Sequence, residues 1–219
     1  MTKAELLAEL NLILDDTVGS CSSDLLCPPA QKYRWLSEGQ DKFCEDTGFF
    51  IDITNAAFQI TLVAGQRDYE LDDRIIKVLE LWDDTRFIPP LDRPYRSDMS
   101  SLLVGEGTPQ AWLCDREPGK ITIYPVPTEV KTLQMKVWRY PMTALTDGEP
   151  EIPNRLQRAC VEWAAYKVLL MHDAELRNKA KAIEHLSNYQ QYVADGVKYL
   201  RRLKGVDLQF GCDPIYLGA

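Results

Sequence analysis

The chain has 219 residues, of which 45% are hydrophobic and 26% are charged, and its net charge is −8. This composition is too apolar for a disordered chain and provides enough material for a hydrophobic core. No apolar run approaches the roughly 20 residues that a membrane-spanning helix needs, and the first ten residues lack the layout of a signal peptide. We therefore expect a protein made in a cytoplasm, or assembled from one, with no membrane partner.

The charge is unevenly distributed along the chain. Residues 1–152 carry 15 basic and 26 acidic side chains, whereas residues 153–204 carry 10 basic and 5 acidic ones. An acidic body with a basic helical segment is a poor arrangement for sequence-specific DNA binding. It suits a protein that meets oppositely charged faces of its own copies or of partners.

Two helices are predicted in the N-terminal part. Residues 2–16 begin with a capping box of Thr2 and Glu5. Their apolar residues recur at helical spacing and are Leu6, Leu7, Leu10, Ile13 and Leu14. After a polar loop at 17–27, Pro28 and Pro29 open a second helix that ends at Gly48, because proline is tolerated in a first turn. Its apolar face is interrupted by Gln40 and consists of Ala30, Tyr33, Leu36, Phe43 and Cys44.

Residues 49–150 change to the alternating pattern of strands. The expected strands are residues 58–63, 68–71, 75–82, 86–91, 111–114, 120–124 and 133–140, and a single helical turn is expected near 97–103. Pro89 and Pro90 restrict the fourth strand to a sheet edge. Residues 111–124 form a hairpin that turns through Pro118 and Gly119. Short strands separated by turn signals predict a small antiparallel sandwich.

Two more helices follow the strands. Residues 151–172 carry a broad apolar face that includes Trp163 and Leu170, and residues 173–204 carry a long stripe that ends before Gly205. The stripe consists of Leu176, Ala180, Ile183, Leu186, Tyr189, Val193, Val197, Leu200 and Leu203. Helices from the two ends of the chain must meet to bury these faces. We expect Trp163 and Leu170 to be buried against the first two helices.

The predicted class is therefore α+β, in which a helical bundle carries an inserted antiparallel β module. Residues 1–48 and 151–204 would form the bundle, residues 49–150 the β-rich insertion, and residues 205–219 an extended C-terminal arm.

The sequence predicts no catalytic residue, metal site or cofactor. Paired aspartates lie at turns and helix ends, where aspartate is favoured for local hydrogen bonding. His172 and His185 are 13 positions apart with no cysteine pair nearby, which is not a zinc-ligand spacing. Cys21 and Cys27 flank a short loop and could pair, although a reducing compartment argues against it. An interaction protein is favoured over an enzyme; the alternative is a small-molecule-binding or enzymatic module that uses the β insertion.

Several segments, taken in their order and spacing, resemble the head-to-tail adaptor proteins of tailed bacteriophages. They are the leucine helix that ends Ile13-Leu-Asp-Asp and residues 36–48, 65–71, 107–112, 121–127, 151–153 and 160–166. The resemblance implies a homododecameric ring in the neck of the virion. A portal protein would lie on one side, tail or nozzle proteins on the other, and genome DNA would pass through the central channel without tight binding. It also implies that no catalytic residues are present and that the C-terminal segment contributes to portal contacts.

The C-terminal segment contains apolar side chains without any helical or strand period, namely Leu208, Phe210, Ile215, Tyr216 and Leu217. One interpretation is an arm packed on its own subunit. The interpretation we prefer is an extended arm that docks into a portal or a neighbouring adaptor and orders when it binds. The basic end of the preceding helix would lie beside it and meet an acidic partner surface through Lys198, Arg201, Arg202 and Lys204.

Overall fold

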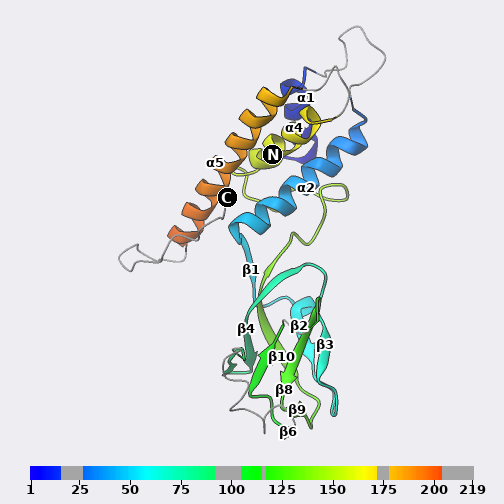
Figure 1. Ribbon diagram of the computed structural model, residues 1–219, viewed down its shortest axis with the longest axis vertical. Helices are drawn as coiled ribbons and strands as arrows, with labels where there is room; N and C mark the ends of the chain where they lie inside the picture. Colours follow the sequence, from blue (N-terminus) through cyan, green and yellow to red (C-terminus); the bar gives the residue numbers. More distant parts are fainter. Residues whose placement is uncertain (16–26, 92–104, 115–116, 172–177, 204–219) are drawn as a thin grey trace. The chain divides into compact units, whose positions relative to one another are not determined.

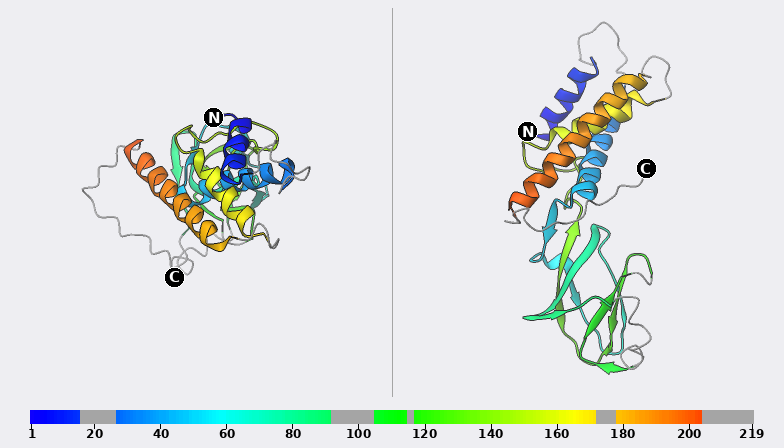
Figure 2. Two further views of the ribbon diagram at one scale, coloured as in Figure 1. Left: turned by 90° about the horizontal axis from the view of Figure 1, so that it is seen from above. Right: turned by 60° about the vertical axis from the view of Figure 1, so that its left-hand side comes forward.

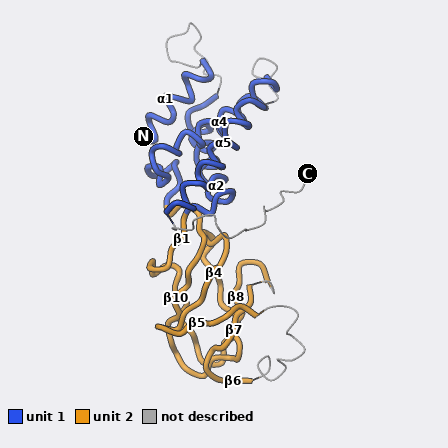
Figure 3. The backbone as a smooth tube through the Cα atoms, turned by 90° about the vertical axis from the view of Figure 1, so that its left-hand side faces the viewer, with its two compact units in different colours: residues 1–49, 143–219 blue, residues 50–142 orange. Residues whose placement is uncertain are grey.

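The computed structural model describes residues 1–15, 27–91, 105–114, 117–171 and 178–203. Among these residues the chain forms four α-helices, two before and two after a run of strands (Figure 1), which confirms the predicted α+β class. It divides into two compact units, residues 1–49 with 143–219 and residues 50–142 (Figure 3). Three predicted features lie outside the described residues: the helical turn at 97–103, the start of the last helix near Asp173, and the C-terminal arm.

The two N-terminal helices are α1 (Lys3–Ile13) and α2 (Pro29–Thr47). The capping box is confirmed: the Glu5 backbone N–H donates to the Thr2 hydroxyl at 3.2 Å, and the Thr2 N–H donates to the Glu5 carboxylate at 2.8 Å. α2 ends as predicted at Gly48, whose φ of 66° is left-handed. α1 ends earlier than predicted, and Asp15 follows it with a φ of 54°, a conformation that aspartate tolerates better than most residues.

The buried faces of these helices differ from the predicted stripes in three places. In α1 only Leu6 and Leu10 are fully buried. In α2 Ala30 is exposed, whereas Gln40 is buried and does not interrupt the face. The Gln40 amide oxygen accepts a hydrogen bond from the Glu151 backbone at 3.1 Å, so this polar side chain ties α2 to the returning chain.

The C-terminal helices are α4 (Arg158–Leu169) and α5 (Lys179–Leu203). α4 begins seven residues later than predicted, because residues 151–157 form turns in which the Gln157 amide donates to the Ile152 carbonyl at 2.7 Å. The expected burial of Leu170 is wrong, since it follows the end of α4 and is 39% exposed. Trp163 is half-buried, and its ring packs on Tyr166 and Tyr189 with centroid distances of 5.6 and 5.1 Å.

α5 meets the rest of the helical unit along a narrow strip. Its buried residues are Ala182, Tyr189 and Gly196, which recur every seven positions. The broad stripe predicted for this helix is wrong at Ala180, Ile183 and Leu203, which are exposed. Figures 1 and 2 show α5 running along one side of this unit and α2 along another, while α4 packs against both.

The second unit is a two-layer sandwich, as predicted. The larger sheet has the order β1-β10-β4-β5 with β2 also paired to β10, and the smaller sheet has the order β3-β8-β7; all these pairs are antiparallel. Their bounds are β1 (Phe50–Asp52), β2 (Gln59–Thr61), β3 (Asp68–Glu70), β4 (Ile75–Asp83), β5 (Arg86–Ile88), β7 (Ala111–Leu113), β8 (Lys120–Tyr124) and β10 (Thr132–Arg139). A 3-10 turn (Ala56–Phe58) precedes β2, and β6 (Glu106–Gly107) pairs in parallel with β9 (Val126–Pro127).

The core of the sandwich is built from alternate residues of both sheets. Leu133, Met135 and Val137 of β10 face Ile121 and Ile123 of β8 in one buried cluster. Trp112 is buried, and its indole N–H donates to the Ile88 carbonyl at 2.9 Å. β5 is an edge strand that ends before Pro89, which also confirms the expectation for this segment. Trp35 and Trp138 are half-buried, like Trp163.

Candidate functional site

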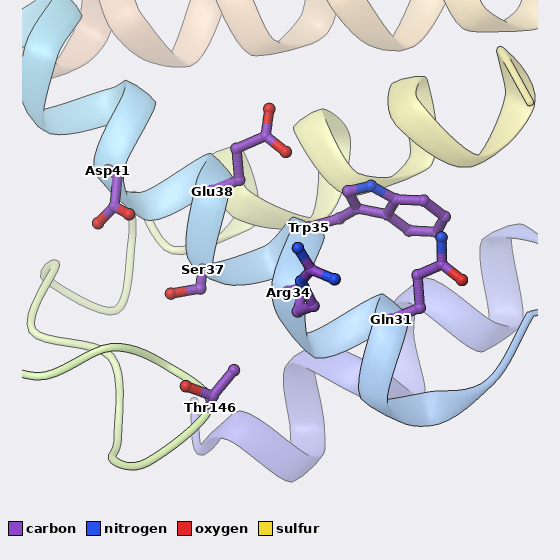
Figure 4. Close-up of a pocket in the computed structure, with 7 residues that line it drawn as sticks. All are labelled: Gln31, Arg34, Trp35, Ser37, Glu38, Asp41 and Thr146. Atoms are coloured by element: carbon purple, nitrogen blue, oxygen red, sulfur yellow. The ribbon is translucent and has the colours of Figure 1, made fainter.

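The exposed flank of α2 contains a hollow of about 450 Å³. Figure 4 shows the side chains that line it, six from α2 and one from the segment that follows the strands: Gln31, Arg34, Trp35, Ser37, Glu38, Asp41 and Thr146. These α2 positions lie three and four residues apart, on the side of the helix away from the fully buried Leu36 and Phe43. The segment with Thr146 is held by the buried Leu145, whose backbone N–H donates to the Ser37 hydroxyl at 3.2 Å.

Asp41 is the least compensated charge in this hollow. Burial, together with the nearby charges of Glu45 and Glu38, raises the pKa of its carboxyl from 3.8 to about 6. Both neighbours have their own cations: Glu38 pairs with Lys167 of α4 at 2.8 Å, and Glu45 pairs with Lys42 at 3.0 Å. Among the described residues Asp41 itself has no hydrogen bond or ion pair. The hollow therefore presents, in the described part of the chain, a half-buried carboxylate that no cation pairs with, and the half-buried ring of Trp35 lies toward its other end (Figure 4).

Asp41→Asn should stabilise the isolated fold at neutral pH. The Asp41 carboxyl, with a folded pKa of about 6 and an ordinary value of 3.8, holds its proton more tightly in the folded chain. The negative charge of Asp41 therefore lowers the free energy of unfolding by its full amount when the pH is well above 6. It has no effect when the pH is well below 3.8, where the carboxyl is protonated in both states. Because the group is partly open to solvent, we expect a gain of about 1 kcal/mol at pH 8.

Thermal melts of wild type and variant at pH 8 and pH 4 measure this difference, with the exposed Glu129→Gln as control. If Asp41→Asn and the wild type melt at the same temperature at pH 8 as well as at pH 4, the Asp41 carboxyl is fully hydrated in the folded chain.

The basic end of α5 forms a second exposed charged surface. Arg201 and Arg202 are exposed, and Lys198 has a side-chain exposure of 65% while pairing with Asp195 at 3.2 Å. The structure therefore places three of the four predicted basic residues at one helix end, where cations also complement the helix dipole. Lys204 and the five apolar residues of the predicted arm lie outside the described residues.

A buried polar cluster joins α1, α4 and α5, and the sequence analysis missed it. The Glu162 carboxylate is almost fully buried and contacts His185 Nδ1 at 2.7 Å, Asn188 Nδ2 at 3.3 Å and Arg158 Nε at 3.5 Å. Arg158 in turn pairs with Glu9 of α1 at 3.1 Å. The spacing of four between Arg158 and Glu162 was a readable signal for one of these contacts.

The α2 hollow was missed as well, because the sequence analysis followed only the apolar face of that helix. The series Trp35, Glu38, Asp41 and Glu45 at spacings of three and four was a sufficient signal for a charged flank that includes one aromatic ring.

The sandwich has a hollow of similar size, about 450 Å³, along the free edges of β2 and β3. Its lining is mainly polar and includes Asp68, which accepts a hydrogen bond from the Thr122 hydroxyl at 2.7 Å, together with Glu70 and Lys120. In the part of the chain that the structure describes, no group of three histidine, cysteine, aspartate or glutamate side chains is suited to hold a metal ion.

Four of the six cysteines lie in the part of the chain that the structure describes. Cys27, Cys44 and Cys160 are buried and Cys114 is half-buried, while Cys21 lies outside the described residues. Burial raises the pKa of the Cys160 thiol to about 12, which makes it an inert packing residue.

Comparison with known proteins agrees with the resemblance noted in the sequence. No curated protein matches the chain. None of the helices in the described ranges is both long and apolar enough to cross a membrane. The family model described as SU10 adaptor protein matches residues 1–205, which takes in all four helices and the whole sandwich. The chain therefore belongs to the SU10 adaptor protein family, a family of phage head-to-tail adaptors, and its role is that of a structural adaptor in a tailed phage.

Proposed function

We propose that this adaptor assembles with copies of itself into a closed ring, twelve subunits by the family resemblance, in the neck of the virion. The ring would connect the portal protein to tail or nozzle proteins, and its central channel would let genome DNA pass. The observation that carries the proposal is the family match over residues 1–205. The two exposed surfaces of opposite charge, on α2 and at the end of α5, support self-association.

The charge distribution supports a channel that does not grip DNA. Tight duplex binding needs clustered lysine and arginine side chains that release counterions from the phosphates. Residues 1–152, which include the whole sandwich, carry 26 acidic against 15 basic side chains. Such a surface repels phosphates, which is what a conduit for sliding DNA requires.

We further propose that the C-terminal arm attaches the ring to the portal. Residues 206–219 follow directly after the matched region and contain five large apolar side chains, Leu208, Phe210, Ile215, Tyr216 and Leu217. An extended apolar segment gains affinity by burying such side chains in a partner groove and pays its ordering entropy at that step.

Deletion of residues 206–219 tests this attachment. The truncated chain should keep its melting temperature within about 2 °C, because removing an arm that does not pack on its own subunit leaves the fold unchanged. It should no longer co-sediment with the purified portal of the same phage. A chain of full length in which the five apolar residues are serine is the matched control for length, and it should fail in the same way. Unchanged portal binding by both variants, or unfolding of the truncated chain, would rule out the arm as the docking element.

A further inference from the structure

We propose that neighbouring subunits contact each other through two defined surfaces, the acidic flank of α2 and the basic end of α5. The acidic flank is formed by Trp35, Glu38, Asp41 and Glu45, and the basic end by Lys198, Arg201 and Arg202. The occupant of each acidic flank is thus the basic end of a second copy of this chain. This inference rests on the proposed ring and names the surfaces that close it.

The charges of the two surfaces are complementary and are not balanced within one chain. Residues 38–46 carry four acidic and one basic side chain, whereas residues 195–203 carry one acidic and three basic ones. Among the described residues Asp41 has no cationic partner, and no ion pair joins Arg201 or Arg202 to a carboxylate. A contact between copies would supply each side with its missing countercharge.

The acidic flank also has the chemistry to receive a guanidinium group. Trp35 and Asp41 are both half-buried and line one hollow of about 450 Å³, with the Trp35 ring near Gln31 and Asp41 toward the other end (Figure 4). Arginine stacks on aromatic rings and pairs with carboxylates through the same planar group. One arginine of a second copy could therefore stack on Trp35 while another pairs with Asp41. Arg34 lies about two turns before Asp41, so an incoming cation would favour the end of the hollow with Asp41.

The placement of the two helices fits a ring. Figures 1 and 2 show α5 and α2 on different sides of the helical unit. An interface between two different surfaces of identical subunits is head-to-tail, and repetition of it generates a closed ring when the rotation closes. A contact between two equal acidic flanks or two equal basic ends would be repulsive.

Two charge-reversed variants of the full chain test the contact. The first carries Asp41→Lys and Glu45→Lys, and the second carries Arg201→Glu and Arg202→Glu. Each variant alone places like charges at every contact and should remain monomeric under conditions in which the wild type assembles. In an equal mixture the two variants can alternate around the ring. Each contact then joins a positive surface to a negative one, either in the wild-type orientation or with the two charges exchanged. The mixture should therefore recover the assembly of wild-type mass, measured by native mass spectrometry.

Matched controls distinguish charge reversal at the proposed contact from two other effects, loss of the fold and a change in the net charge of the chain. Lys179→Glu with Lys181→Glu makes the same change at exposed positions in the first turn of α5, and Asp73→Lys with Glu129→Lys does so on the sandwich. Both should assemble as the wild type does, and all variants should keep the wild-type circular dichroism spectrum.

The outcomes distinguish this contact from the ring itself. If the wild type forms a ring and the reversed variants also form it alone, the ring stands and these surfaces are not its contacts. If each variant alone does not assemble and their mixture does not assemble either, the acidic flank of α2 does not pair with the basic end of α5. If the mixture recovers only a dimer, the contact is two-fold and does not build a ring. If the wild type forms no ring, alone or with portal, the proposed function is wrong, and the contact that closes the ring is wrong with it.

Discussion

Replacing Glu162 with alanine is expected to cost the helical unit about 2–4 kcal/mol of unfolding free energy, because polar side chains of α5 lose a charged hydrogen-bond acceptor. The Glu162 side chain is 5% exposed and accepts from His185 and Asn188 of α5 while pairing with Arg158 of its own helix. Alanine would leave His185 and Asn188 without this charged acceptor, whereas the half-exposed Arg158 would keep its pair with Glu9. The loss follows mainly from the groups left unpaired.

Urea unfolding of the full chain, followed by circular dichroism, measures this loss. Glu162→Gln keeps an acceptor oxygen in the same place and should lose less than alanine does. Glu184→Ala removes an exposed carboxylate from α5 and should change stability by less than about 0.5 kcal/mol. A loss below about 1 kcal/mol for Glu162→Ala would mean that α4 and α5 are held together by apolar contacts alone.

Gly39→Leu is the second change with a large expected effect, a loss of about 3 kcal/mol. A Cβ atom at Gly39 would lie 3.0 Å from Cys160 Cα and 3.1 Å from the Cys160 carbonyl oxygen. These are backbone atoms of α4 and cannot rotate away, so α2 and α4 would have to separate and lose packing. Helix propensity acts in the opposite direction, since leucine favours a helix over glycine by less than about 1 kcal/mol.

A graded series tests the close approach directly. Gly39→Ala should already destabilise the chain, by about 1–2 kcal/mol, although alanine is the best helix former. Ala30→Leu places the same side chain at an exposed position of α2 and should be nearly neutral. Stabilisation by Gly39→Ala would show that the two helices do not meet at this glycine.

Local signals predicted most of the secondary structure. The Thr2–Glu5 capping box, the stop at Gly48 and the edge strand before Pro89 depend on a few neighbouring residues, and all three are present in the structure. The alternation in β8 and β10 likewise predicted which side chains fill the sandwich. Such features depend on the capping, glycine and proline residues at the ends of an element and on the spacing of apolar residues along it. Both can be seen in a single sequence.

The depth of burial on each helix was less predictable. Ile183 and Leu203 have the period of a core stripe, yet the fully buried residues of α5 are Ala182, Tyr189 and Gly196. Conversely, Gln40 and Glu162 were expected at no core position, and both are buried with oxygen atoms that contact partners distant in the sequence. Periodicity indicates which residues share a face, whereas the neighbours of that face depend on the tertiary arrangement.

One of the two candidate interaction surfaces could be predicted from local sequence, whereas the other depends on the tertiary arrangement. The basic end of α5 could be read as a local charge cluster, and the structure places Arg201 and Arg202 on the exposed end of that helix. The hollow beside Asp41 needed Thr146, which lies more than 100 positions away, to complete its lining. Composition and spacing alone also do not identify an adaptor; the ordered set of short segments suggested it, and the family match established it.

The most direct test of the proposed ring is the mass of the purified full chain, measured by native mass spectrometry alone and after mixing with the portal protein of the same phage. The ring predicts one closed species of twelve copies of a 25.0 kDa chain, about 300 kDa, either on its own or bound to portal. A chain that stays monomeric at every concentration, and that adds no mass to the portal, would contradict it.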